Sequence, residues 1–596
     1  MTAVPDKVYR CPTDLTVTPT PLGRIVIIGS CLASAWKAVV EASEYSCPCD
    51  FFLLNNAAQL PDTPPHPVED YSFQIVQIPL RTVLPEAAYF RLSYSDPAAY
   101  EQLFIDTRQR LSRFLDEAMR WNREYGTLTF VSNFLVPQQN PMGRLLPRYD
   151  LRNFTYFVEK LNEALDEELR SYRSTFLLDI DQIATTFGRR YLQDDVMWHI
   201  GHASALSDWD HPYDQERIER VEPASSYYPI CSAQFVTNVW HEIVADYRTI
   251  RQLDMVKLVI VDVDDTLWRG VAAESLEIVP KDVEGWPLGV VEALGHLKRR
   301  GVLLAMVSKN TEERLTPLWN RVLGRRLSLD DFAVRKVNWR PKAENVEEIL
   351  SEVNLLPRNV LFVDDNPRER ADVQAAFPEI RAIGPNPYLW RRILLWSPET
   401  QVATITSESA TRTEMVQAQV QRETMRKKMS REEFLSTLET KVQIAAIETT
   451  DHEGFPRALE LINKSNQFNT SGKRWTRQEC EAAFSDHTRF YIFDVRDRFT
   501  AYGIVGVVVM KESIIEQLVM SCRVVGLDVE NAVIAYLIQQ LGSSGYVSVS
   551  GAIKETESNL LCRDLYKRCG FEDSDGSWVR PTIPGLEIPP HVEMVA

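Results

Sequence analysis

An apolar run that ends in a cluster of acids is the feature that most constrains how this chain folds. In KLVIVDVDDTLWRG (257–270), four apolar residues lead directly into Asp262, Asp264 and Asp265. Like charges held together raise the free energy of a folded chain unless a proton or a cation compensates them. The run therefore predicts a buried strand whose end gathers carboxylates around a positive group.

Two other apolar runs end in polar residues in the same way. GVLLAMVSKN (301–310) leads into Ser308, and NVLFVDDNPRERADV (359–373) brings Asp364 and Asp365 to the end of another strand. Strands that alternate with helices form open parallel sheets, in which ligands lie at the carboxyl ends of the strands. These acids and the hydroxyl are therefore expected at one edge of one sheet.

The side chains expected at this edge suit phosphoryl chemistry. Carboxylate oxygens are the ligands that Mg²⁺ prefers, and the candidates are Asp262, Asp264, Asp364 and Asp365. Ser308 and Lys342, which follows VNWRP, would add a hydroxyl donor and a positive charge for the remaining phosphate oxygens. The alternative is a set of solvated acids at strand ends, or a Ca²⁺ site without catalysis.

This set resembles the four motifs of the haloacid dehalogenase (HAD) superfamily. The matching residues are the D-x-D-x-T segment Asp262–Thr266, Ser308, Lys342 and the acidic pair Asp364–Asp365. The resemblance implies that Asp262 is the nucleophile that accepts the phosphoryl group, that Asp264 is the general acid/base, and that the acidic pair holds the metal. The inserts between the motifs are too short for a large folded cap, which predicts an open site for a bulky or protein-borne substrate.

The N-terminal segment predicts a second parallel sheet. The pattern of residues 22–55 predicts a strand, a helix and a second strand, and 126–137 and 174–188 are two further strand candidates. Amphipathic helical segments at 100–124 and 153–172 precede these two candidates. In RIVIIGSCLASAW, Cys31 stands where a buried strand meets the start of a helix. A helix N-terminus lowers the pKa of a thiol and favours the thiolate. Cys31 is therefore a candidate nucleophile, and a packing residue is the alternative.

This block resembles the SGNH-hydrolase fold, with cysteine where that family has its serine. The resemblance implies that Asn133 contributes to an oxyanion hole and that DDVMWHIGH supplies Asp195 and the base His199. The family spacing is D-x-x-H and the spacing here is D-x-x-x-H, so His202 remains a rival for the base. A thiol at position 31 suits acyl storage, because transfer from a thioester to another thiol is nearly balanced.

The C-terminal segment mixes strands with helices and resembles a GNAT acetyltransferase core. YIFDVRDRFTAYGIVGVVVMK, QLVMSCRVVGLDVENAVIAYL and LYKRCGF carry the resemblance. It implies a phosphate-binding turn at Arg523 and Gly526, but Asp528 places a negative charge where a pyrophosphate would meet the helix start. The open alternatives are a site for a phosphopantetheine arm and a domain that only packs.

Length and charge set further limits. A chain of 596 residues is too long for one core, and we expect a multidomain α/β protein with an SGNH-like domain (1–229), a linker (230–256), a capless HAD-like domain (257–400), a helical connector (401–439) and a GNAT-like domain (440–596). A net charge of −17 argues against binding to nucleic acid. The lack of a membrane-spanning run or a secretory signal favours the cytoplasm, and nine cysteines without a zinc pattern favour reduced thiols.

The three blocks together resemble the FkbH-like family of polyketide assembly lines, through DVDDTLWRG, SKN, NWRPKAENV, DDNPRER and NQFN. The resemblance implies a glyceryl transferase/phosphatase that takes 1,3-bisphosphoglycerate, removes phosphate and loads the glyceryl unit on an acyl carrier protein. Cys31 is the best-placed acyl carrier on this chain, and the basic stretches 425–431 and 473–477 are candidate docking sites. The alternatives are a stand-alone HAD phosphatase, a docking protein without activity, and the loading of another three-carbon unit such as lactyl.

Overall fold

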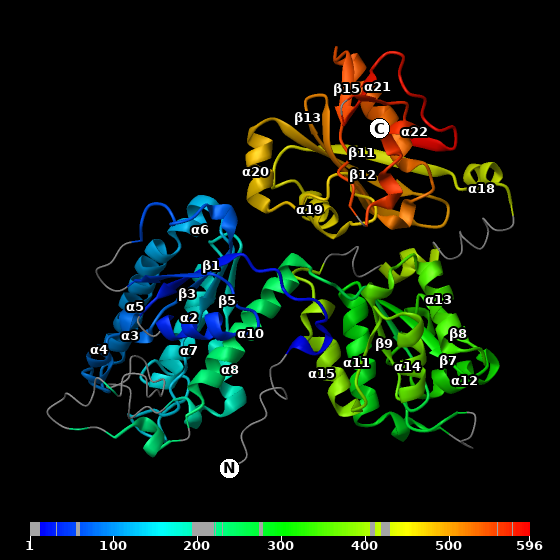
Figure 1. Cartoon of the computed structure of the whole chain (residues 1–596). Coiled ribbons are helices and arrows are strands. Elements are labelled where there is room, and N and C mark those ends of the chain that lie inside the picture. Colours follow the sequence, from blue (N-terminus) through cyan, green and yellow to red (C-terminus); the bar gives the residue numbers. More distant parts are fainter. Residues whose placement is uncertain are drawn as a thin grey trace. The chain divides into compact units, whose positions relative to one another are not determined.

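The chain forms three β-sheets in a computed structural model (Figure 1). The described residues are 12–30, 33–54, 60–193, 212, 220, 222–228, 230–272, 278–405, 412–418, 429–556, 558–574 and 576–595. The chain divides into two compact units, Met1–Arg248 with the first sheet and Thr249–Ala596 with the other two. Two parallel sheets and one mixed sheet confirm the predicted multidomain α/β class.

The first sheet is parallel, in the order β2-β1-β3-β4-β5. Its strands are β1 (Arg24–Gly29), β2 (Cys49–Leu53), β3 (Tyr71–Gln77), β4 (Thr129–Ser132) and β5 (Thr175–Leu178). Its main helices are α2 (Ala33–Ala42), α5 (Pro97–Ala118), α7 (Phe154–Leu169) and α8 (Ile180–Phe187). Strand β3 is missing from the sequence prediction because Gln74 and Gln77 interrupt its apolar pattern, although both are buried.

Two segments of this unit differ from the sequence predictions. The strand expected over 174–188 ends at Leu178, because the Asp179 side chain accepts a hydrogen bond from Gln182 N (2.9 Å) and caps helix α8. The expected linker 230–256 contains helix α10 (Ser232–Arg251), whose Trp240 ring lies 6.1 Å from the ring of Phe73 on β3. Helix α10 therefore packs on the first sheet, because its apolar residues recur at helical spacing.

The second sheet is also parallel, in the order β10-β9-β6-β7-β8. Its strands are β6 (Leu258–Val261), β7 (Leu303–Ser308), β8 (Val334–Val337), β9 (Val360–Val363) and β10 (Arg381–Ala382). Its helices include α11 (Trp286–Arg299), α12 (Glu312–Val322), α13 (Lys342–Val353), α14 (Pro367–Ala376) and α15 (Pro387–Trp396). The three middle strands are entirely buried, as expected for a parallel sheet covered on both faces.

The third sheet is mixed, in the order β16-β17-β15-β14-β13-β12-β11-β18. Its strands are β11 (Thr440–Ile447), β12 (Thr488–Arg496), β13 (Ala501–Lys511), β14 (Ile514–Met520), β15 (Ser548–Gly551), β16 (Glu572–Ser574), β17 (Ser577–Pro581) and β18 (Val592–Val595). Its helices include α19 (Phe455–Lys464), α20 (Arg477–Ser485), α21 (Val529–Ser543) and α22 (Leu565–Arg568). The described parts of the expected helical connector are helical at 412–418 and in α18 (Arg431–Thr437).

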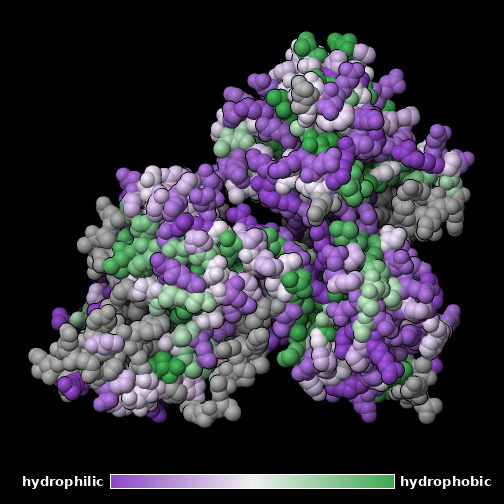
Figure 2. Space-filling view, in the orientation of Figure 1, coloured by the Kyte–Doolittle hydropathy of each residue, from purple (hydrophilic) through white to green (hydrophobic). Residues whose placement is uncertain are grey.

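In Figure 2, hydrophilic side chains dominate the surface of the part of the chain that contains the third sheet. Apolar side chains form small separate groups on this surface. The apolar residues of this sheet instead fill two buried clusters, one of which includes Val508 and Leu518 and the other Val507 and Val519. Successive residues of the strands thus alternate between the two clusters, as the pleat requires. Among the helices that the structure describes, none has the length and apolarity needed to cross a membrane.

Candidate active site

The carboxyl edge of the second sheet brings together the predicted acids. Val261 and Val363 end the neighbouring parallel strands β6 and β9 and are paired in register. Asp262 and Asp364 are the next residues, and Asp262 N donates to Val363 O (2.9 Å). The two carboxylates therefore leave the sheet side by side, as the sequence predicts.

Lys342 lies between these two carboxylates. Its Nζ is 2.9 Å from Asp262 Oδ1 and 2.6 Å from Asp364 Oδ2, and all three side chains are at least nine-tenths buried. Lys342 is the first residue of α13, so the helix start fixes its backbone at the edge of the sheet. Burial alone would lower the pKa of Lys342. The neighbouring carboxylates of Asp262 and Asp364 instead raise this pKa. The two carboxylates therefore favour the charged form of Lys342.

Three of the carboxylates form a group that suits a divalent cation. Asp262, Asp364 and Asp365 each place one oxygen within 4.8 Å of the others. Asp365 is exposed, while Asp262 and Asp364 are buried, so the group opens to solvent on one side. A set of hard oxygen donors with room for water is the environment that Mg²⁺ requires. The donor set therefore fits Mg²⁺.

The group of three carboxylates does not include the Asp264 side chain, whose role as a metal ligand stays a prediction. Its Oδ1 accepts hydrogen bonds from Trp268 Nε1 (2.8 Å) and Ala272 N (3.0 Å). Burial raises the pKa of Asp264, and these two donors work against that rise. These two hydrogen bonds hold the Asp264 carboxylate by its Oδ1 atom.

Ser308 supplies a hydroxyl at the same edge. It is the last residue of β7, and its side chain is buried. Within the described part of the chain its Oγ has no hydrogen-bond partner, and a buried hydroxyl without a partner costs free energy. A phosphoryl oxygen of a bound substrate would satisfy it, so the orphaned hydroxyl fits the predicted role of Ser308.

The loops around the site are tied together by side chains that sequence reasoning did not single out. The hydroxyl of Thr266 accepts from Asp365 N (3.3 Å), which joins the loop after β6 to the loop after β9. Asn338 and Asn345 exchange side-chain amide hydrogen bonds of 3.0 and 3.1 Å across the turn that leads to Lys342. Thr266 belongs to the D-x-D-x-T motif, whereas the amide pair carries no signal beyond its N-x₆-N spacing.

The predicted thiol site in the first unit is only partly described. Cys31, Asp195, His199 and His202 lie outside the described residues. Asn133 is buried at the end of β4, where its Nδ2 donates to Asp179 Oδ1 (2.7 Å).

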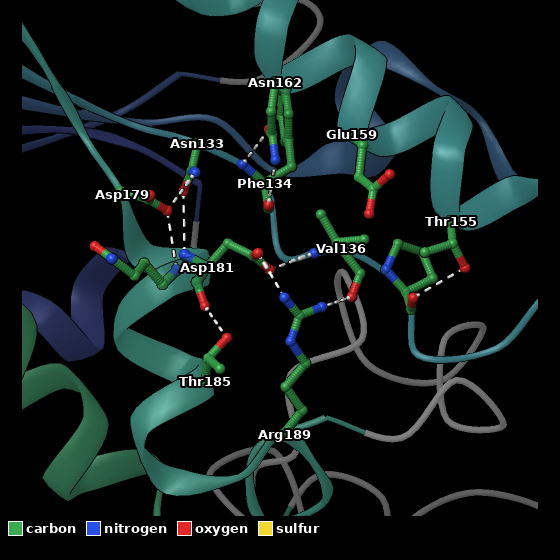
Figure 3. A network of polar contacts seen from close by, with 12 residues as sticks. Asn133, Phe134, Val136, Thr155, Glu159, Asn162, Asp179, Asp181, Thr185 and Arg189 are labelled. Atoms are coloured by element: carbon green, nitrogen blue, oxygen red, sulfur yellow. Dashed lines mark hydrogen bonds and ion pairs between the residues drawn. The ribbon is translucent and has the colours of Figure 1, made fainter. Parts of the chain in front are cut away.

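Asn133 belongs to a network of polar contacts that fixes the segment after β4 (Figure 3). Its Oδ1 accepts from Asp181 N (3.2 Å), so the amide bridges β4 and the start of α8. The Asp181 carboxylate accepts from Val136 N (2.7 Å) and pairs with Arg189 (2.5 Å). Asn162 in α7 binds both N and O of Phe134, each at 2.9 Å. The structure therefore gives Asn133 an anchoring role at the carboxyl edge of the first sheet.

The predicted cofactor turn of the third sheet does not suit a pyrophosphate. Arg523 is buried and its Nε donates to Ser521 Oγ (3.0 Å), while Gly526 has the positive φ (85°) of a tight turn. Asp528 occupies the N-cap position of α21 without a side-chain capping bond, and it pairs with Arg431, whose Nη2 lies 2.7 and 2.8 Å from its two carboxylate oxygens. A carboxylate at the helix start repels the anion that such a turn would bind.

Comparisons with known proteins add no evidence about the site beyond its geometry. No family model and no curated protein matches the sequence. One similar solved structure is the N-terminal part of BF1531 from Bacteroides fragilis, which contains a phosphatase domain complexed with Mg (19% identity, 68% of this chain and 100% of that chain, TM-score 0.46). Another is phospholipase A1 from Streptomyces albidoflavus NA297 (10% identity, 37% and 99%, TM-score 0.25). Likenesses at these scores carry no argument about this chain.

Proposed function

We propose that the second sheet carries a Mg²⁺-dependent phosphatase site in which Asp262 is the nucleophile. The observation that carries this proposal is the buried contact of Lys342 with both Asp262 and Asp364, next to the exposed Asp365. A purely structural ion pair does not require a third carboxylate at the same point, and buried acids without a ligand raise the free energy of the fold. A site that binds Mg²⁺ and a phosphoryl group together explains all three acids and the lysine.

The side chains support two chemical steps. Lys342 contacts Asp262 through Oδ1, and the Asp262 carboxylate attacks the phosphorus atom while the ester P–O bond breaks. Asp264 gives its proton to the departing oxygen, and then takes a proton from the water that hydrolyses the aspartyl-phosphate. Ser308 and Lys342 hold phosphoryl oxygens. Asp262, Asp364 and Asp365 would hold Mg²⁺, which when bound supplies Lewis-acid stabilisation of the phosphoryl charge.

We further propose a specific pathway for this activity, on the strength of the FkbH-like resemblance. The Cys31 thiolate attacks the C1 carbonyl of 1,3-bisphosphoglycerate, and phosphate leaves as the thioester forms. The second-sheet site hydrolyses the C3 phosphomonoester. The pantetheine thiol of an acyl carrier protein then takes the glyceryl group from Cys31.

Intact-protein mass spectrometry tests this pathway. The chain is incubated with Mg²⁺, 1,3-bisphosphoglycerate and a pantetheinylated carrier protein, and wild type is run beside Cys31→Ala and Asp262→Asn. We expect a glyceryl adduct on the carrier with wild type, no adduct with Cys31→Ala, and a phosphorylated adduct with Asp262→Asn. Phosphate release by wild type and by Cys31→Ala alike, with no adduct on either protein, would leave a stand-alone phosphatase and contradict the transferase.

A further inference from the structure

The hydrogen bonds of Asp264 leave one of its two oxygens for chemistry. Both hydrogen bonds that its carboxylate accepts in the described part of the chain go to Oδ1, from Trp268 Nε1 and Ala272 N. Two donors on one oxygen fix the plane of a carboxylate, so the side chain cannot turn freely. Asp264 is only partly buried, and neither of these two donors binds its other oxygen, Oδ2.

The indole that holds Asp264 is itself fixed. The Trp268 side chain is fully buried, and its ring packs at 61° against the ring of Trp319, with 6.0 Å between centroids. The loop that carries it is closed by Leu267 N donating to Val263 O (2.8 Å) and by Gly270 N donating to Asp265 Oδ1 (2.6 Å). A buried side chain on a closed loop is a precise support for a catalytic group.

We infer that Trp268 is a positioning residue that holds Asp264 to protonate the leaving group of a phosphate ester of an alcohol. This inference rests on the proposed phosphatase function. When Asp262 attacks such an ester, the P–O bond breaks and the alkoxide takes its proton from Asp264, so an alcohol leaves. An aryloxide such as p-nitrophenolate is stable without a proton and needs this transfer far less.

Trp268→Phe tests the inference because it keeps a buried ring and removes only the indole N–H. Trp390→Phe is the matched control, since it removes the N–H of another buried tryptophan, which donates to the backbone oxygen of Gly384 (2.7 Å) and whose ring packs on Trp286. The values of kcat/KM for glycerol 3-phosphate and for p-nitrophenyl phosphate are measured with Mg²⁺, because kcat/KM reports the step in which the alcohol leaves.

We expect Trp268→Phe to lower kcat/KM roughly tenfold for the alkyl ester and less than about twofold for the p-nitrophenyl ester. Trp390→Phe should leave the ratio of the two values at that of wild type. Equal losses on both esters, or the same ratio as in Trp390→Phe, would overturn the positioning role. If the wild-type protein turned over neither ester, that result would instead contradict the proposed phosphatase function.

Two measurements separate positioning from a failure to fold. Turnover of p-nitrophenyl phosphate by Trp268→Phe itself shows that the site has formed, and replacement of Trp268 by benzothienylalanine keeps the size of the indole without its N–H. In the background of Asp264→Asn, Trp268→Phe should cause no further loss on the alkyl ester, because the two changes remove the same function. Additive losses would overturn the inference.

Discussion

At the scale of single residues, the site depends on one buried cation between two acids. Lys342 Nζ contacts Asp262 and Asp364 at 2.9 and 2.6 Å in a region with almost no solvent access. We expect Lys342→Met to lower kcat/KM for p-nitrophenyl phosphate by about 100-fold or more, because one fixed positive donor beside the reacting group stabilises phosphoryl charge by that order.

Lys336→Met is the matched control for that change. Lys336 also contacts two carboxylates, at 2.8 Å (Glu348) and 2.7 Å (Glu352), but it lies in β8 and away from Asp262. We expect its loss to leave kcat/KM within about twofold of wild type, as surface ion pairs contribute little. Equal losses in the two variants would show that Lys342 acts only on stability.

Residue types and their order predict much of this site, but not its supports. The acids, Ser308 and Lys342 are visible because each follows an apolar run or a short polar turn. The role of Trp268 is hidden because a tryptophan four residues after Asp264 looks like any buried aromatic residue. The place of Asp264 outside the metal group is hidden too, because its orientation depends on the closed loop that follows it.

At the scale of elements, apolar runs predict strands well where they are uninterrupted. β6, β7 and β9 are unbroken apolar runs and are readily identified. β3 is missed because Gln74 and Gln77 are buried within it, and the end of β5 is missed because the cap at Asp179 lies inside an apolar run. Buried polar residues and caps depend on tertiary partners that a local pattern does not contain.

Helix α19 predicts a measurable response to acid. The Glu460 carboxylate lies between Arg457 (2.6 Å) and Lys464 (2.8 Å). Burial alone would raise the pKa of Glu460, but these two cations lower this pKa from 4.5 to about 2. A carboxyl whose pKa is depressed on folding stabilises the fold above its unfolded value, and this contribution is lost as the pH falls from 4.5 towards 2.

We therefore expect the difference in melting temperature between wild type and Glu460→Gln to be largest above pH 5 and to shrink between pH 4.5 and 3. Differential scanning fluorimetry across this range measures it. Glu453→Gln is the control, because Glu453 is exposed in the turn before the same helix. A constant difference at all pH values would show that Glu460 does not titrate with folding.

We expect the network of Figure 3 to stabilise the segment after β4 against local opening rather than the whole fold against unfolding. Asp181 holds the backbone of Val136 directly and through Arg189, so we expect Asp181→Ala to speed hydrogen exchange in the segment after β4. Asp166→Ala removes an exposed pair with Arg170 on α7 and serves as control. Unchanged exchange at Val136 in Asp181→Ala would mean that packing of Phe134 and Val136 alone fixes the segment.

At the scale of the whole molecule, the two compact units assign the proposed activities to different parts of the chain. The phosphatase residues all lie in the unit Thr249–Ala596, whereas Asn133 and the sequence position of Cys31 belong to Met1–Arg248. Helix α10 shows why a boundary is hard to place from sequence, because its periodic apolar residues extend to the edge of the second unit. The length of the chain alone predicts only that it has several domains.

This division predicts that the fragment 252–596 keeps the phosphatase and loses transfer. We expect its kcat/KM for p-nitrophenyl phosphate to lie within about threefold of the full chain, because the acids, their cation and their loops are all retained. It should form no carrier adduct from 1,3-bisphosphoglycerate. A soluble, folded fragment without phosphatase turnover would show that the first unit contributes to the phosphatase site.

The most direct test of the central claim is to trap the phosphoryl group on Asp262. The full chain is mixed with p-nitrophenyl phosphate and Mg²⁺, quenched rapidly in acid, digested and examined by mass spectrometry. The proposal predicts one added phosphoryl group on the peptide that contains Asp262, absent in Asp262→Asn and after removal of Mg²⁺ with EDTA. Turnover of the substrate by Asp262→Asn at the wild-type rate, or a phosphoryl group on another residue, would contradict it.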